Sequence, residues 1–181
     1  MSNCLPGRVH LPGRIRSIGR HMLTVAFTAC SLLDAKVASA DATCSVAATG
    51  VSFGAYDISL LTPNDATGDV TITCSYVPPG AATTINFQAA LSPGMSGSYT
   101  PRQMASGPAR LNYNLFRDAA RTLIWGNGLS STSITTGELK VGPGIGNGTR
   151  SAQLPVYGRV PPQQLVPMGP YTDNIVVTVT F

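Results

Sequence analysis

The chain has 181 residues, and its 12 Lys and Arg against 8 Asp and Glu give a formal net charge of +4. Residues 1–40 hold five of the twelve basic residues and one of the eight acidic ones, so seven of each sign remain in residues 41–181. This balance excludes the basic footprint of a nucleic-acid-binding domain and a polybasic membrane patch.

The first forty residues have the three regions of a secretory signal peptide. A basic stretch is followed by the apolar run 22–33, which is too short to span a bilayer. Small residues at Ala38 and Ala40 then form a cleavage motif, so the sequence predicts export and cleavage after Ala40. In the alternative, "FTAC" is a lipoprotein signal and Cys30 carries the lipid. We expect no stable membrane anchor.

The cysteines divide in the same way as the charges. Cys4 and Cys30 fall in the presequence, and Cys44 and Cys74 remain in the mature chain. An even pair of cysteines in an exported protein predicts a disulfide. Its loop of about 30 residues would stabilise the fold by about 3–4 kcal/mol on a chain-entropy model. Two buried free thiols are the alternative.

The mature sequence predicts an all-β domain, because apolar and polar residues alternate in short runs separated by turn signals rich in Gly and Pro. Pro155 indicates a sheet edge or a bulge, and 116–123 allows a turn or two of helix at most. Such a series predicts a sandwich or barrel forming one domain over residues 41–181. The candidate strands in chain order are 69–76, 83–91, 110–118, 137–141, 152–160 and 174–181.

The sequence ends in "NIVVTVTF", a run with strict alternation. One face would carry Val176, Thr178 and Thr180. The other face would carry Ile175, Val177, Val179 and Phe181. A strand cannot stand alone, because its backbone groups need partners and its apolar face needs a cover. This segment is therefore predicted to pair with another strand.

The residues available for chemistry favour a structural or binding protein over an enzyme. Both histidines, His10 and His21, lie in the presequence, so histidine-based catalysis and metal binding have no ligands in the mature chain. Lys140 is the single lysine of the mature chain, and no sequence motif around it indicates a catalytic role. We predict no catalytic residue, no metal site and no cofactor.

Three features allow a ligand but have a simpler structural interpretation. "GPGIGNG", residues 142–148, lacks the spacing of a phosphate-binding loop and is better explained as a hairpin loop. Asp65 and Asp69 could bind calcium weakly, although solvated turn carboxylates are favoured. Trp125 could be a sugar platform, but a buried structural role is favoured.

Several stretches together resemble the spore coat protein U domain family, which includes the pilins of archaic chaperone–usher pili. They span nearly the whole mature chain, and "YNLFRDAART" followed by "WGNG" is specific. The two cysteines also match the family's placement. The stretches are "CSVAATGVSFGAYD", "GDVTITC", "RLNYNLFRDAARTLIWGNG", "LPVYGRVPPQQ" and "GPYTDNIVVTVTF".

The resemblance implies an incomplete immunoglobulin-like β-sandwich that lacks its final strand. In such a pilin a periplasmic chaperone lends a strand to the open groove, and at the outer-membrane usher the next subunit's N-terminal extension replaces it. Ile175, Val177, Val179 and Phe181 would then form the groove edge.

One departure concerns the donor arm that a shaft pilin carries ahead of its first cysteine. Only Asp41, Ala42 and Thr43 separate the predicted cleavage site from Cys44. We therefore expect a subunit that accepts a strand without giving one, in a minor or tip position involved in adhesion or biofilm formation. A stand-alone secreted spore-coat or surface protein of the same fold is the alternative.

Overall fold

A computed structural model describes residues 41–181 of the protein. The predicted signal peptide, its cleavage site and Cys30 lie outside the described residues. Among the residues described, no helix has the length and apolar character needed to cross a lipid bilayer.

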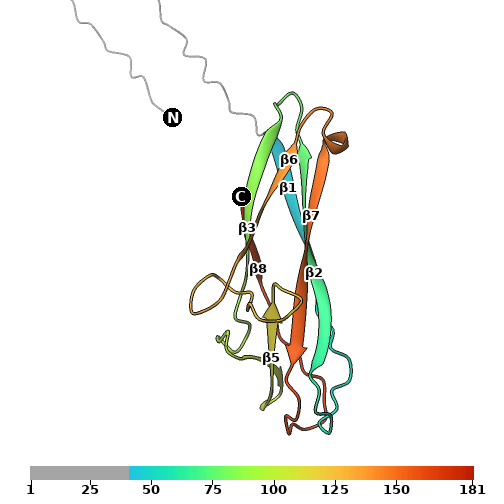
Figure 1. Cartoon of the computed structure of the whole chain (residues 1–181), viewed down its shortest axis with the longest axis vertical. Coiled ribbons are helices and arrows are strands. Elements are labelled where there is room, and N and C mark those ends of the chain that lie inside the picture. Colours follow the sequence, from blue (N-terminus) through green and yellow to red (C-terminus); the bar gives the residue numbers. More distant parts are fainter. Residues whose placement is uncertain (1–40) are drawn as a thin grey trace, which may run out of the picture. The chain divides into compact units, whose positions relative to one another are not determined.

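The described chain folds into two antiparallel sheets that pack face to face (Figure 1). The larger sheet has the strand order β1-β2-β7-β5-β4, and the smaller has the order β6-β3-β8. A short 3-10 turn, Gly146–Gly148, precedes β7. The strands are β1 (Ala42–Thr49), β2 (Asn64–Tyr76), β3 (Thr83–Leu91), β4 (Arg102–Ser106), β5 (Ala109–Phe116), β6 (Thr135–Val141), β7 (Thr149–Val160) and β8 (Val177–Thr180).

The alternation in the sequence explains which side chains enter the core. In β2, Val70, Ile72 and Cys74 are buried, whereas the threonines between them face outward. The strands β3 and β5 repeat this pattern and bury alternate residues from the opposing sheets. The predicted all-β, immunoglobulin-like sandwich is confirmed.

Local structure departs from the sequence expectations in several places. Strand β1 was not among the candidate strands, and Asp65 and Asp69 lie within β2 and not in a turn. Strand β4 was not predicted, because its five residues show no strong β pattern and owe their extended form to pairing with β5. Residues 116–123 form turns and no helix. Residues 142–148 connect β6 to β7, which lie in different sheets, so this segment is not the loop of a hairpin.

Pro155 lies in β7 opposite Asp69 of β2. The pairing of β7 with β5 covers only residues 157–159, so at Pro155 the strand has a neighbour on one side alone. A missing N–H is tolerated there. The edge interpretation is therefore right locally, although β7 as a whole lies inside the sheet.

Two fully buried side chains tie the sheets together. The Trp125 indole Nε1 donates to the Ala89 carbonyl of β3 at 2.9 Å. The Arg102 guanidinium of β4 donates to the carbonyl oxygens of Ser92 and Trp125, with shortest distances of 2.9 and 2.7 Å. Because Trp125 is 0% exposed, it cannot act as a sugar platform.

Candidate functional site: an open side of the sandwich

The C-terminal strand β8 forms one edge of the smaller sheet. It pairs antiparallel with β3, with Val177 opposite Leu91 and Val179 opposite Ala89, and no described strand pairs with its other side. Val177 and Val179 are half-buried toward the core, and Ile175 just before the strand is too. Phe181, which follows β8, is 55% exposed. Three of the four predicted edge residues thus share the inner face.

Strand β1 forms an edge of the larger sheet and pairs only with β2 within the described residues. Val46 lies directly opposite Ile72, which is buried, so both side chains are on the core-facing side of the sheet. Val46 is nevertheless 42% exposed. A core-facing valine stays exposed because no residue of 41–181 covers this stretch of the inner face.

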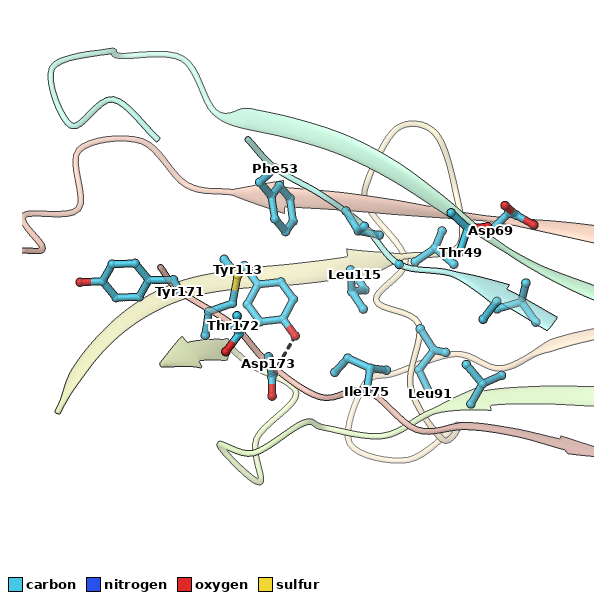
Figure 2. A pocket seen from close by; sticks show the side chains of 17 residues that line it. Thr49, Phe53, Asp69, Leu91, Tyr113, Leu115, Tyr171, Thr172, Asp173 and Ile175 are labelled. Carbon is cyan, nitrogen blue, oxygen red and sulfur yellow. Dashed lines mark hydrogen bonds between the residues drawn. The ribbon is translucent and has the colours of Figure 1, made fainter. Parts of the chain in front are cut away.

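A hollow of about 300 Å³ lies between the end of β1 and the segment that leads into β8 (Figure 2). Ala48 and Val51 line it on the β1 side, and Ile175 and Val177 line it on the β8 side. The deeper lining is apolar and comes from both sheets, namely Val70, Leu91, Leu115 and Val156. We call this hollow, with the open edges of β1 and β8 beside it, the groove.

A polar pair closes the groove at one end. The Tyr113 hydroxyl donates to Asp173 Oδ2 at 2.7 Å (Figure 2). Asp173 Oδ1 also accepts from the Met95 backbone N–H at 2.8 Å. Burial, followed by the hydrogen bond to this carboxylate, raises the pKa of Tyr113 far above its ordinary value. Tyr113 therefore stays protonated and holds Asp173 in place.

The edges of β1 and β8 differ from the other sheet edges in their protection. Strand β6 carries Glu138 and Lys140, whose charged groups lie 3.8 Å apart. Strand β4 is covered, because Ala105 exchanges two backbone hydrogen bonds with Thr172. Strands β1 and β8 contain no charged residue. Natural sheets usually guard exposed edges against pairing, so these two edges are suited to receiving a strand.

Comparison with known proteins places the chain in a family. The Spore Coat Protein U domain matches residues 29–178 of the sequence. The chain belongs to the spore coat protein U domain family. Protein U of Myxococcus xanthus is 31% identical over 142 residues, which cover 72% of this chain and 71% of that protein.

A solved structure of lower similarity is the CsuC–CsuE chaperone–tip adhesion subunit pre-assembly complex from the archaic chaperone–usher Csu pili of Acinetobacter baumannii. It shares 19% sequence identity, with a TM-score of 0.44, and the match covers 77% of this chain and 40% of that chain.

For this spore coat protein U domain, the sequence predicted the β8 side of the groove but not the β1 side or the polar pair at its end. The alternation at the C-terminus marked Ile175, Val177 and Val179. The sequence did not predict that Val46 on the inner face of β1 is exposed. The run "CSVAAT" does not indicate on which side the strand lacks a partner strand. Tyr113 and Asp173 are 60 residues apart in sequence, and nothing in the sequence links them.

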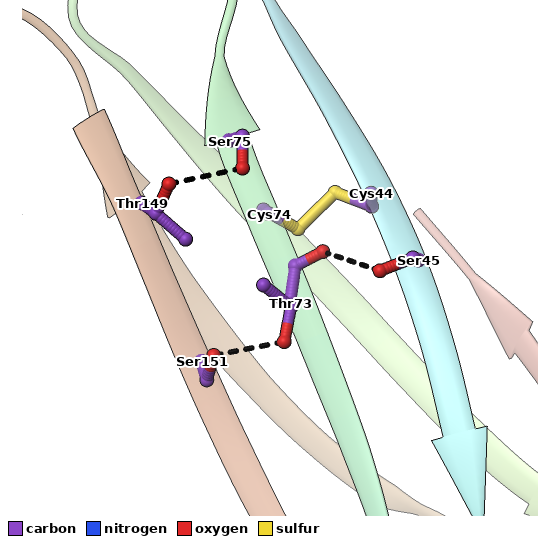
Figure 3. Close-up of a disulfide and its surroundings, with 7 residues drawn as sticks. All are labelled: Cys44, Ser45, Thr73, Cys74, Ser75, Thr149 and Ser151. Atoms are coloured by element: carbon purple, nitrogen blue, oxygen red, sulfur yellow. Dashed lines mark hydrogen bonds between the residues drawn. A yellow bond between two sulfur atoms is a disulfide. The ribbon is translucent and has the colours of Figure 1, made fainter.

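The disulfide of this family member stiffens the β1 wall. Cys44 and Cys74 are bonded and lie directly opposite in the β1–β2 register, with Cα atoms 4.1 Å apart (Figure 3). The predicted disulfide is therefore confirmed. Because β1 has a strand on one side only, this bond fixes an edge that backbone pairing alone would hold more weakly.

Replacing Cys74 by serine should lower the yield of folded protein and destabilise it by about 2–5 kcal/mol, as removal of a native disulfide from a small secreted domain commonly does. The unfolding midpoint in urea measures the effect. Thiol labelling of the denatured, unreduced wild type supplies the control, and two reactive thiols per chain would contradict the bonded state.

Proposed function

We propose that this protein is a structural subunit of a surface pilus of the archaic chaperone–usher type, exported through the periplasm. The observation that carries the proposal is the groove, whose apolar lining lies between two strand edges that carry no charge and that no strand of residues 41–181 pairs with. A strand inserted there would bond to open backbone groups and cover Val46 and Val177. This is β-strand addition, in which main-chain bonds give affinity and side-chain pockets give register.

The partners that follow from this proposal are a periplasmic chaperone, an outer-membrane usher and neighbouring pilin subunits. An unfilled apolar edge promotes aggregation, so the chaperone would shield the groove until another subunit replaces it. The proposal requires no catalytic residue, metal or cofactor, since folding and strand exchange supply the whole activity.

We further propose that the subunit accepts a strand without donating one, in a tip or other minor position involved in adhesion or biofilm formation. The contacts at the start of the domain support this. The Asp41 carbonyl accepts from the Val77 N–H at 3.0 Å, and Thr43 pairs with Ser75 in β1. With cleavage after Ala40, the first residues of the mature chain would already be paired within their own domain and could not serve as a donor strand.

The second candidate is a stand-alone secreted coat or surface protein of the same fold. The similarity to Protein U and the family's spore-coat description favour it. Purification of the exported protein from cells with and without a candidate chaperone separates the two. A chaperone–subunit complex supports the pilin. A stable monomer that does not bind the chaperone supports the coat-protein candidate.

A synthetic strand peptide from a shaft subunit should bind this protein and raise its melting temperature. Mass action predicts about 2.7 kcal/mol of stabilisation when the free peptide is at a hundred times its Kd. A peptide of the same composition without the alternation is the matched control. The segment "DATCSV", offered to a shaft subunit, should leave that subunit's melting temperature unchanged. Head-to-tail fibres formed by the purified protein alone would refute the acceptor-only assignment.

A further inference from the structure

A second hollow lies at one end of the sandwich, outside the groove's open edges. Asn64 at the start of β2 pairs with Val160 at the end of β7, so the segments 50–63 and 161–176 meet at the same end. Between them is a hollow of about 750 Å³ lined by residues of both segments, including Tyr56, Ile58, Val166 and Met168. We call it the loop-end hollow.

Side-chain hydrogen bonds hold the walls of this hollow in place. The Tyr56 hydroxyl donates to the Pro161 carbonyl and accepts from the Gln164 N–H, both at 2.8 Å. The Gln164 side chain bonds to both the N–H and the C=O of Asn112 in β5. The Tyr171 hydroxyl donates to the Pro167 carbonyl at 2.9 Å. A largely preformed apolar hollow of this size is typical of small-molecule sites.

The residues that line the hollow limit which kinds of ligand it could bind. Asp57 is the single charged residue among those that line the hollow, and its carboxylate already accepts from Ser59 N–H and Oγ. No lining side chain could neutralise an anionic group. Pro167 and Pro170 lack backbone N–H groups, so this wall cannot support the ladder that a peptide strand needs.

Apolar side chains continue from the hollow onto its rim. Ile58 is half exposed, and Met168 is fully exposed. Leu165, beside Val166, is directed into solvent and does not line the hollow. The rim could therefore contact the part of an apolar ligand that extends out of the hollow. A compact polar ligand would gain nothing from it.

From these features we propose that the loop-end hollow binds the alkyl chain of an uncharged amphiphile. The interior would take the chain, and the exposed rim at Ile58 and Met168 would contact the methylenes nearest the head group. The hollow adjoins the groove, because Val51, Phe53, Met104 and Tyr171 line both, but the proposed binding needs no strand exchange.

The test uses 1-decanol as ligand and the uncharged dye N-phenyl-1-naphthylamine as fluorescent reporter. The dye should brighten with the full mature protein, and decanol should displace it. Val166→Trp should weaken decanol binding by about tenfold or more, the loss expected when a pocket no longer accepts one or two methylenes. The adjacent Leu165→Trp, which adds the same ring on the solvent side, should bind as the wild type does.

Two further measurements keep the result decisive. Ile58→Asp, at an exposed position, should also weaken binding without depending on how Val166→Trp folds. Decanoate should bind more weakly than decanol, because its carboxylate would lie near Asp57. The same titration is repeated with the groove filled by a strand peptide. A dye signal that disappears then, or equal binding by wild type and Val166→Trp, would overturn the loop-end assignment and leave the pilin proposal standing.

Discussion

Replacing Val177 by aspartate is expected to abolish recovery of the protein as a chaperone complex. Val177 is half-buried, lines the groove and pairs through β8 with Leu91 of β3. A strand inserted beside β8 would enclose the new carboxylate among apolar side chains. Nothing there could pair with it, and burying an unpaired charge is far more costly than keeping it in water. The measurement is the amount of subunit that co-purifies with the chaperone from the periplasm.

Val176→Asp provides a matched control, because Val176 is the adjacent residue and its side chain is 58% exposed on the outer face. It should give nearly the wild-type yield of complex, and so should Thr178→Ser. Equal loss with Val176→Asp would mean that the terminal segment tolerates no charge at all. Normal recovery with Val177→Asp would exclude the groove as the chaperone's site.

Replacing Arg102 by methionine should destabilise the sandwich by about 2–6 kcal/mol, a large fraction of the stability of a small domain. Arg102 is fully buried and donates to Ser92 O, Trp125 O and Asn114 Oδ1. Its guanidinium also lies 5.0 Å from the centre of the Tyr99 ring. Methionine fills similar space but leaves the Ser92 and Trp125 carbonyl oxygens without this donor, at about 1–3 kcal/mol for each that stays buried. Asn114 Oδ1 keeps its bond from the Leu115 N–H.

Urea denaturation followed by circular dichroism measures this effect. The control is Arg110→Met in β5, where the side chain is exposed and bonds only to nearby carbonyls of Gly107 and Ala109. Its effect should stay within about 0.5 kcal/mol. If both variants lose the same stability, the buried network around Arg102 is not what holds the two sheets together.

Burial also lowers the pKa of the Arg102 guanidinium, although the neighbouring Tyr113, Tyr99 and Asp173 oppose this change. No sequence pattern pointed to Arg102 as a core residue, because arginine is among the residues least often fully buried. Its acceptors come from segments far apart in the chain, Ser92, Asn114 and Trp125. They meet only when β4 is placed beside the end of β3.

The strands were easiest to predict where pairing and burial act in the same direction. Residues 83–91 were predicted with the observed bounds, since alternate residues enter the core from a strand with neighbours on both sides. The terminal run was predicted over 174–181, but only Val177–Thr180 pairs as a strand. Val176 still accepts a backbone hydrogen bond from the Ser92 N–H, but residues 174 and 175 leave the ladder because the chain there crosses from β4, where Thr172 bonds to Ala105, to the edge of the other sheet.

By itself, the sequence determined the all-β class and the inward face of the terminal strand, and it favoured a disulfide between Cys44 and Cys74 over two free thiols. These follow from alternation and cysteine count, which are local properties of the chain. Only the tertiary structure decided that β1 and β8 are both open edges, that Val46 faces the core uncovered, and that Tyr113 meets Asp173. An unpaired edge is a relation between strands distant in sequence. Local patterning shows that a strand needs a neighbour, and the assembled sheets show which neighbour is missing.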